Sequence, residues 1–366
     1  MSSGTVIVIA GILVATACAL LGTFLVLRRM SMMADAISHA ILPGLVAGFF
    51  FANGPNLLAG FIGAALAALL TVSLVEAIQK SGRVGNDSAI GIVFPAMFAL
   101  GTVIVSRYFA NVHLDSDAIL YGNIEFSAQD SLLINGMNLG PQSFWVMGSL
   151  FIMNLLFVTL FYKELKLATF DAGLAATLGF SPHLIHYGLM VVVSLTAVGA
   201  FTAVGAVLTV ALMIVPAATA YLLTNRLKVM IGLAALVGAL SAIGGYILAV
   251  VVDTSIAGAI TSVAGILFLL TMVLSPSQGI VARAIQLRRQ RLYFATENLV
   301  IHLLQHENTS VAESESRIEH LSSELRWKPE FAQHVIQNAI QREFIVRTNG
   351  HLALTQAGRI FANKAE

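Results

Sequence analysis

The stretch Asp35-Ala-Ile-Ser-His-Ala-Ile-Leu-Pro-Gly44 continues into Leu45-Val-Ala-Gly-Phe-Phe-Phe51 without a further charge. It is an apolar run of membrane-spanning character that carries one carboxylate and one imidazole. Asp35 and His39 are four residues apart, so on a helix they lie on the same face. Ionisable groups at membrane depth are costly and indicate an ion or substrate path, and this pair is a partial site for a divalent transition metal. The alternative is that Asp35 caps the helix and His39 makes an interhelical hydrogen bond.

The composition places the whole chain in the same class. Of the 366 residues, 57% are hydrophobic and 11% are charged, whereas soluble domains average about 25% charged. Residues 5–27 have no small-residue cleavage site followed by a polar domain, so we interpret them as a first transmembrane helix and not as a signal peptide. The single cysteine, Cys18, lies in that run, which excludes a disulfide framework or a thiolate metal cluster.

Apolar runs of spanning length predict an all-α polytopic membrane protein with eight or nine transmembrane helices. In the eight-span alternative, one run would be re-entrant. The break near residue 204 could be either a tight turn or a kink. The expected spans are 5–27, 35–52, 56–78, 88–107, 144–162, 183–203, 205–224, 229–251 and 256–274.

The basic residues predict the orientation of these spans. With the N-terminus outside and nine spans, twelve of the thirteen Lys and Arg residues up to residue 291 fall inside, and only Arg107 falls outside. The C-terminus is then cytoplasmic. The inside set is Arg28, Arg29, Lys80, Arg83, Lys163, Lys166, Arg226, Lys228, Arg283, Arg288, Arg289 and Arg291.

The external segment 108–143 is acidic and contains no Lys or Arg. Its negative charge would attract a cation or a basic partner, although a solvated loop explains it equally well. We therefore add His113, Asp115 and Asp117 as further candidate metal ligands. Residues 138–141 are expected to form a turn.

One cytoplasmic loop has the pattern of a short docking helix. Asp171 is expected to cap a helix that Gly179 ends, with Leu174 and Leu178 forming an apolar edge. Such a helix suits a groove on another protein, although any loop between two spans can coil in this way.

Several segments together resemble one family, the membrane permeases of ABC importers for manganese, zinc and iron. The resemblance covers about residues 5–280. It is carried by Arg28–Gly44, Asp87–Ile92 with Phe98–Gly101, Phe170–Gly179, Val204–Ala220, and Gly244–Tyr246 through Val252–Thr254.

The resemblance implies a transport subunit of the bacterial cell (inner) membrane, with no permanently bound cofactor. Asp35 and His39 would contact the transported Mn, Zn or Fe, and Phe170, Asp171, Ala175 and Gly179 would contact the ATPase. The chain has no Gly-x-x-x-x-Gly-Lys-Ser/Thr loop, so ATP hydrolysis would belong to a separate ATPase subunit. Further expected partners are an extracytoplasmic metal-binding protein, membrane lipid, and a second permease chain that is identical or paralogous.

The C-terminal part differs from the rest. We expect a transmembrane domain at 1–280, a basic linker at 281–291, and a small α+β domain at 292–366 that resembles winged-helix domains, including those of metal-responsive repressors. Its expected elements are helices at 297–305, 311–325, 329–341 and 356–364, with a hairpin at 344–354 around an Asn-Gly turn. The domain has seven Lys and Arg against nine Asp and Glu, which argues against DNA binding and favours a protein contact.

Two other functional classes stay open. An ion-gradient-driven secondary transporter would also carry intramembrane carboxylates, but it has no reason to carry a docking-helix loop. A membrane-tethered metal-responsive regulator is suggested by the tail and opposed by its acidity.

Overall fold

The computed structural model describes residues 2–52, 57–108, 124–126, 131–134, 137–276, 278–307, 316–317, 320, 325–348 and 350–365. The chain divides into two compact units, Met1–Gln278 and Gly279–Glu366.

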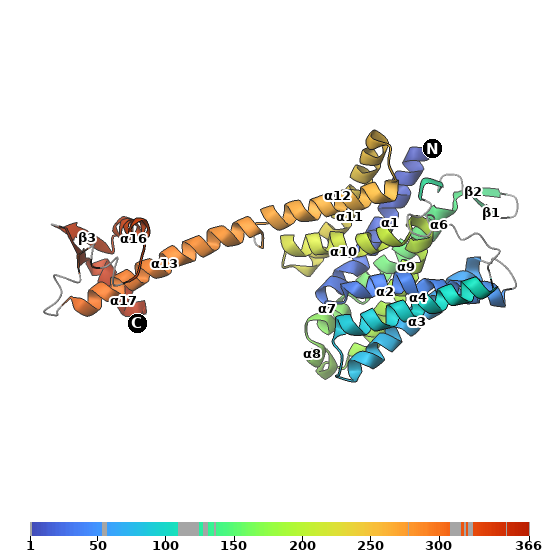
Figure 1. Ribbon diagram of the computed structural model, residues 1–366, viewed down its shortest axis with the longest axis horizontal. Coiled ribbons are helices and arrows are strands. Elements are labelled where there is room, and N and C mark those ends of the chain that lie inside the picture. The colour runs from blue at the N-terminus through green and yellow to red at the C-terminus, as the bar shows by residue number, and fades with distance from the viewer. Residues whose placement is uncertain are drawn as a thin grey trace. The chain divides into compact units, whose positions relative to one another are not determined.

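The first unit is a bundle of long apolar helices (Figure 1). Nine helices in the described residues are long and apolar enough to cross a membrane, as the sequence predicts. No end differs from its expected position by more than four residues. The helices are α1 (Ser3–Leu27), α2 (Ser31–Phe51), α3 (Leu57–Lys80), α4 (Asn86–Tyr108), α6 (Gln142–Leu160), α9 (Pro182–Val204), α10 (Ala206–Leu223), α11 (Leu227–Val252) and α12 (Ile256–Leu274).

The ambiguous break near residue 204 is a turn between two helices. Gly205 separates α9 from α10 with φ of +81°, a left-handed conformation that a residue with a Cβ rarely adopts.

Small residues let the helices approach closely. A Cβ on Gly22 of α1 would overlap the carbonyl of Met213 in α10, and one on Gly44 of α2 would overlap the carbonyl of Gly63 in α3. Lipid chains are as apolar as the helices, so association depends on such close packing and on polar contacts between helices. Asn154 of α6 supplies a polar contact, because its Nδ2 donates to the Ala17 carbonyl at 3.0 Å and its Oδ1 accepts from the Thr196 hydroxyl at 3.0 Å.

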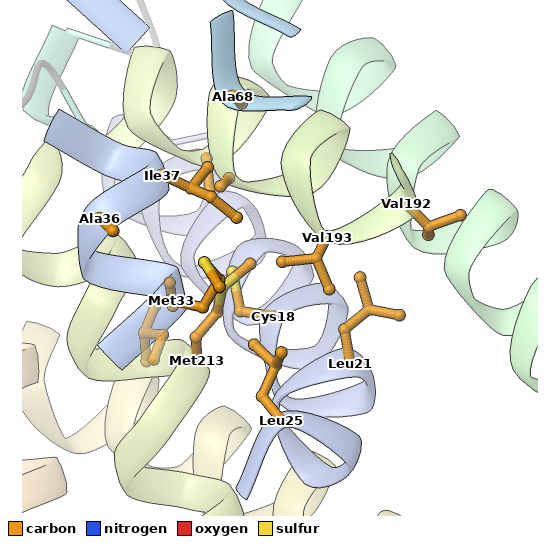
Figure 2. Close-up of a cluster of buried hydrophobic side chains, with 14 of the residues drawn as sticks. Cys18, Leu21, Leu25, Met33, Ala36, Ile37, Ala68, Val192, Val193 and Met213 are labelled. Carbon is orange, nitrogen blue, oxygen red and sulfur yellow. The ribbon is translucent and has the colours of Figure 1, made fainter. Parts of the chain in front are cut away.

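The core lies where α1, α2, α9 and α10 meet. Figure 2 shows side chains from these helices gathered around Cys18, Met33 and Met213, with Val193 beside them. All four are fully buried.

Shorter elements lie at the two ends of this bundle. The antiparallel strands β1 (Ser131–Ile134) and β2 (Met137–Pro141), with the 3-10 turn η1 (Ile124–Phe126), lie at the end opposite α7 (Tyr162–Phe170) and α8 (Ala172–Thr177) (Figure 1). The expectation of a turn at 138–141 is wrong, because these residues belong to β2. The Asn-Gly pair at 135–136, a typical hairpin signal, is the cue for this hairpin.

The second unit is a small α+β domain. Its described elements are α13 (Ile280–His306), α16 (Pro329–Gln341), β3 (Ile345–Thr348), β4 (His351–Leu354) and α17 (Gln356–Ala365). The residues of the expected basic linker, 281–291, are helical and form the first half of α13. The expected helix at 311–325 falls mostly outside the described residues.

The hairpin and the core of this unit follow the sequence pattern. Strands β3 and β4 pair in register from Ile345 and Leu354 to Thr348 and His351, and Gly350 has φ of +86°. The Asn of the expected Asn-Gly turn lies outside the described residues. Buried apolar side chains from every element form the core, including Leu299, Leu303, Val335, Ile345 and Leu354. The order of helices, hairpin and helix is the expected one, and the likeness to winged-helix domains stays a prediction.

Candidate functional site

The proposed metal pair is exposed on one face of α2. Because the helix begins at Ser31, Asp35 lies one turn inside it and is not the cap that the alternative interpretation requires. His39 Nε2 is 3.5 Å from Asp35 Oδ1, and the two side chains are 32% and 42% exposed. The same-face prediction is confirmed, and both polar groups remain accessible to a ligand.

Helix α4 packs against this face and restricts the imidazole. The His39 ring lies 5.2 Å from the Phe94 ring and 5.9 Å from the Phe98 ring, measured between centroids. One turn further along, Gly101 lies so close to Pro43 that a Cβ there would be 2.8 Å from the proline Cδ. The aromatic contacts hold the imidazole beside Asp35 and supply no competing charge.

Pro43 also changes the backbone of the site. Proline has no N–H, so the helical hydrogen bond that would end on the His39 carbonyl cannot form. A carboxylate oxygen, an imidazole nitrogen and a main-chain carbonyl oxygen thus lie within one turn of helix. This donor set suits Mn²⁺, Fe²⁺ and Zn²⁺.

The surroundings of this pair are otherwise apolar. Within the described part of the chain, no cluster of three or more His, Cys, Asp or Glu side chains could hold a metal ion. A cavity of about 550 Å³ between α2, α3 and α4 is lined only by apolar residues and glycine, among them Pro43, Gly63 and Met97. It therefore offers no side-chain ligand to an ion.

The other three candidate ligands, His113, Asp115 and Asp117, lie outside the described residues. Of the acidic residues in the same segment, 108–143, Glu125 is described. Its Oε1 accepts a hydrogen bond at 3.3 Å from the Ile256 amide at the start of α12, so it acts as a helix cap.

The predicted cytoplasmic helix forms as α8. Asp171 is its N-cap, with Oδ1 accepting from the Leu174 amide at 2.9 Å, and Gly179 follows the helix with φ of +85°. Ala175 is fully buried against the bundle. Leu174 and Leu178, the expected apolar edge, are 46% and 57% exposed, and Phe170 just before the helix is 62% exposed.

A second polar cluster was missed by the sequence reasoning. Glu76, near the end of α3, is only 8% exposed and contacts His186 and Tyr187 at the start of α9. Arg28, just after α1, contacts His186 and also Thr169 of α7. Burial lowers the pKa of the Arg28 guanidinium, which remains charged because its ordinary pKa is so high. The available signal was Glu76 itself, a lone carboxylate inside the apolar run 57–80.

Comparisons with known proteins agree with this architecture. The model of the ABC 3 transport family matches residues 5–275. The zinc transport system membrane protein TroD of Treponema pallidum is 45% identical over 352 residues, which cover 96% of each chain. The manganese transport system membrane protein MntD of Bacillus subtilis is 42% identical and covers 78% of this chain and 97% of its own length.

One solved structure is also similar. PsaBC from Streptococcus pneumoniae, in complex with Fab, superposes with a TM-score of 0.65 at 31% sequence identity. The match covers 79% of this chain and 96% of that chain.

Proposed function

The chain belongs to the ABC 3 transport family, and we propose that it is the membrane permease through which an ATP-driven importer moves a divalent transition metal. The observation that carries the proposal is the half-exposed Asp35–His39 pair on α2, inside a bundle of membrane-spanning helices. A permease must replace part of the ion's hydration shell while binding it weakly enough to release it. Two side-chain ligands, and a main-chain carbonyl that lacks its usual helical donor, meet both needs.

Manganese and zinc are the proposed ions, because relatives transport one or the other. The donor set suits both ions and so does not identify the cargo, and the general affinity order alone would favour zinc over manganese at such a site. Selection of manganese would therefore depend on the protein that delivers the ion and on the coordination geometry of the metal-bound site.

We infer that a second permease chain, identical or paralogous, covers the metal pair. Asp35 and His39 lie one and two turns inside α2, and ionisable side chains in membrane segments almost always face the interior of a helix bundle or a water-filled path and not lipid. A facing chain would enclose a polar path and could supply further ligands.

The remaining partners follow from the proposed orientation, with the N-terminus outside and the C-terminus cytoplasmic. A separate ATPase subunit would bind the exposed edge of α8, and an extracytoplasmic protein would deliver the metal to the opposite side. Membrane lipid covers the remaining apolar surface.

The test is transport by the complete complex in proteoliposomes. We expect ATP-dependent uptake of Mn²⁺ or Zn²⁺, with ATP hydrolysis stimulated by the loaded binding protein, and Ca²⁺ and Mg²⁺ as controls that should not be taken up. Fe²⁺ is included as a third candidate ion. Uptake that needs an ion gradient and no ATP would instead favour a secondary transporter.

A further inference from the structure

The cluster around Glu76 joins four elements that are distant in the sequence. Arg28 follows α1, Glu76 belongs to α3, Thr169 lies near the end of α7, and His186 lies at the start of α9. Arg28 Nε donates to the Thr169 hydroxyl at 3.1 Å, and Arg28 Nη1 contacts His186 Nδ1 at 3.2 Å. His186 Nε2 in turn contacts Glu76 Oε1. The contacts therefore form a continuous chain from α7 to α3.

The hydrogen bonds fix the protonation of the central imidazole. A guanidinium can only donate, so His186 Nδ1 must accept from Arg28. The ring proton of the neutral imidazole then lies on Nε2 and is donated to Glu76. Tyr187 donates to the other carboxylate oxygen at 2.7 Å, so both oxygens of Glu76 are engaged.

The charges decide what this cluster can do. Besides Arg28, a second cation lies nearby, since Lys80 Nζ is 3.7 Å from Glu76 Oε2. With two permanent cations and only one carboxylate, the cluster has a net positive charge that repels a divalent metal. The carboxylate oxygens are also already engaged in hydrogen bonds. The cluster is therefore unsuited to be a second ion site and is built as a polar link between helices.

Two members of the cluster are close in the sequence to the two proposed working parts of the permease. Thr169 is two residues before Asp171, the cap of α8, and Arg28 is seven residues before Asp35. Arg28 Nη2 is buried and has no hydrogen-bond acceptor in the described residues. This guanidinium nitrogen can therefore donate to a new acceptor if α7 or α9 shifts.

We propose that Arg28, His186 and Glu76 form a clamp that transmits movement of α7 and α8 to the metal pair on α2. These are positioning residues that never contact the ion. The inference rests on the proposed function, since it takes α8 as the ATPase contact and the Asp35–His39 pair as the path.

The test measures metal transported per ATP hydrolysed by the complete complex in proteoliposomes. Glu76→Gln removes the charge with little change of shape, and Thr169→Val removes only the hydroxyl that ties α7 to Arg28. We expect each to lower transport per ATP by about tenfold, a typical allosteric coupling. Copurification with the ATPase and the rate of hydrolysis should stay within about twofold, because the clamp does not form the docking surface.

Two further comparisons separate a clamp from a merely structural contact. Because Thr169 and Glu76 act through one chain of hydrogen bonds, the double variant should be no worse than Glu76→Gln alone. His186→Gln keeps one acceptor and one donor and should retain most coupling, whereas His186→Leu should not. The matched control is Ser73→Ala, an exposed position one turn before Glu76 on α3.

Each outcome has a distinct meaning. Transport per ATP equal to wild type in both Glu76→Gln and Thr169→Val would overturn the clamp and leave the permease function intact. Loss of assembly by Thr169→Val would also overturn it, in favour of a structural role. If Glu76→Gln does not assemble, Thr169→Val decides alone. A wild-type complex that moves no metal with ATP would overturn the proposed function and the clamp together.

Discussion

Asp35 and His39 are joined by one short contact on an exposed face, so each can be changed without opening a cavity. We expect Asp35→Asn and His39→Gln to lower metal uptake by about tenfold or more, since even partners outside the first coordination shell typically cost 10–100-fold. Folding should be nearly unaffected, because both side chains are half-exposed. Uptake of radioactive or fluorescent-reported metal by proteoliposomes measures the effect.

Ser38→Ala is the control for these two variants. Ser38 lies between them in sequence but is buried, and within the described residues its hydroxyl donates only to the Ala34 carbonyl of the same helix, at 2.9 Å. Because one neutral hydrogen bond contributes only about 1 kcal/mol to stability, its loss should leave uptake within about twofold of wild type. Normal uptake by both Asp35→Asn and His39→Gln would mean that the ion passes elsewhere.

Helix α8 presents an apolar edge that the other described residues of the membrane unit leave exposed. Leu174→Asp places a charge on this edge, and Gly179→Val puts a β-branched residue at φ of +85°. Asp171→Ala removes the cap, which costs about 1 kcal/mol. We expect all three to weaken copurification with the ATPase, with Leu174→Asp having the largest effect.

The matched control for α8 is Ala176→Ser, an exposed position on the other side of the helix from Leu174. It should copurify with the ATPase as wild type does. If Leu174→Asp also copurifies and transports normally, α8 is not the docking helix.

The chain as a whole joins a membrane bundle to a small domain that has its own core. We expect residues 279–366 to fold alone, because fully buried Leu299 and Val335 contact a shared apolar cluster. In the isolated domain, Leu299→Ala should cost about 2–5 kcal/mol of unfolding free energy. Ile360→Ala, at a position 65% exposed, should cost little. Urea unfolding followed by circular dichroism measures both.

The net negative charge of residues 292–366 favours a protein partner over DNA, so we expect the domain to act through contacts within the complex. Removing residues 292–366 should alter regulation or complex stability more than the path, because the metal pair lies in the other unit. Sequence-specific DNA binding by the isolated domain at physiological salt would contradict this expectation. Complete loss of metal specificity on truncation would contradict it as well.

Features that depend only on residues close to one another in the sequence could be predicted from it. A membrane span needs only a sufficiently long apolar run, so the nine helices could be placed within four residues. The Asp171 cap and the β3–β4 hairpin are equally local. The same-face position of Asp35 and His39 follows from helical periodicity alone. The turn expected at 138–141 failed because strand pairing overrides a weak local preference.

The sequence by itself thus determined the class of protein, the spans and the shared helical face of Asp35 and His39. Only the tertiary structure decided that α4 packs beside that pair and what Glu76 contacts. Glu76 and His186 are 110 positions apart, and Arg28 and His186 are 158 apart. Helix and strand periodicities relate only residues a few positions apart, so they could not predict these contacts. In a bilayer, apolar faces are nearly equivalent, so close approach at glycines such as Gly22 and Gly101 selects which helices become neighbours.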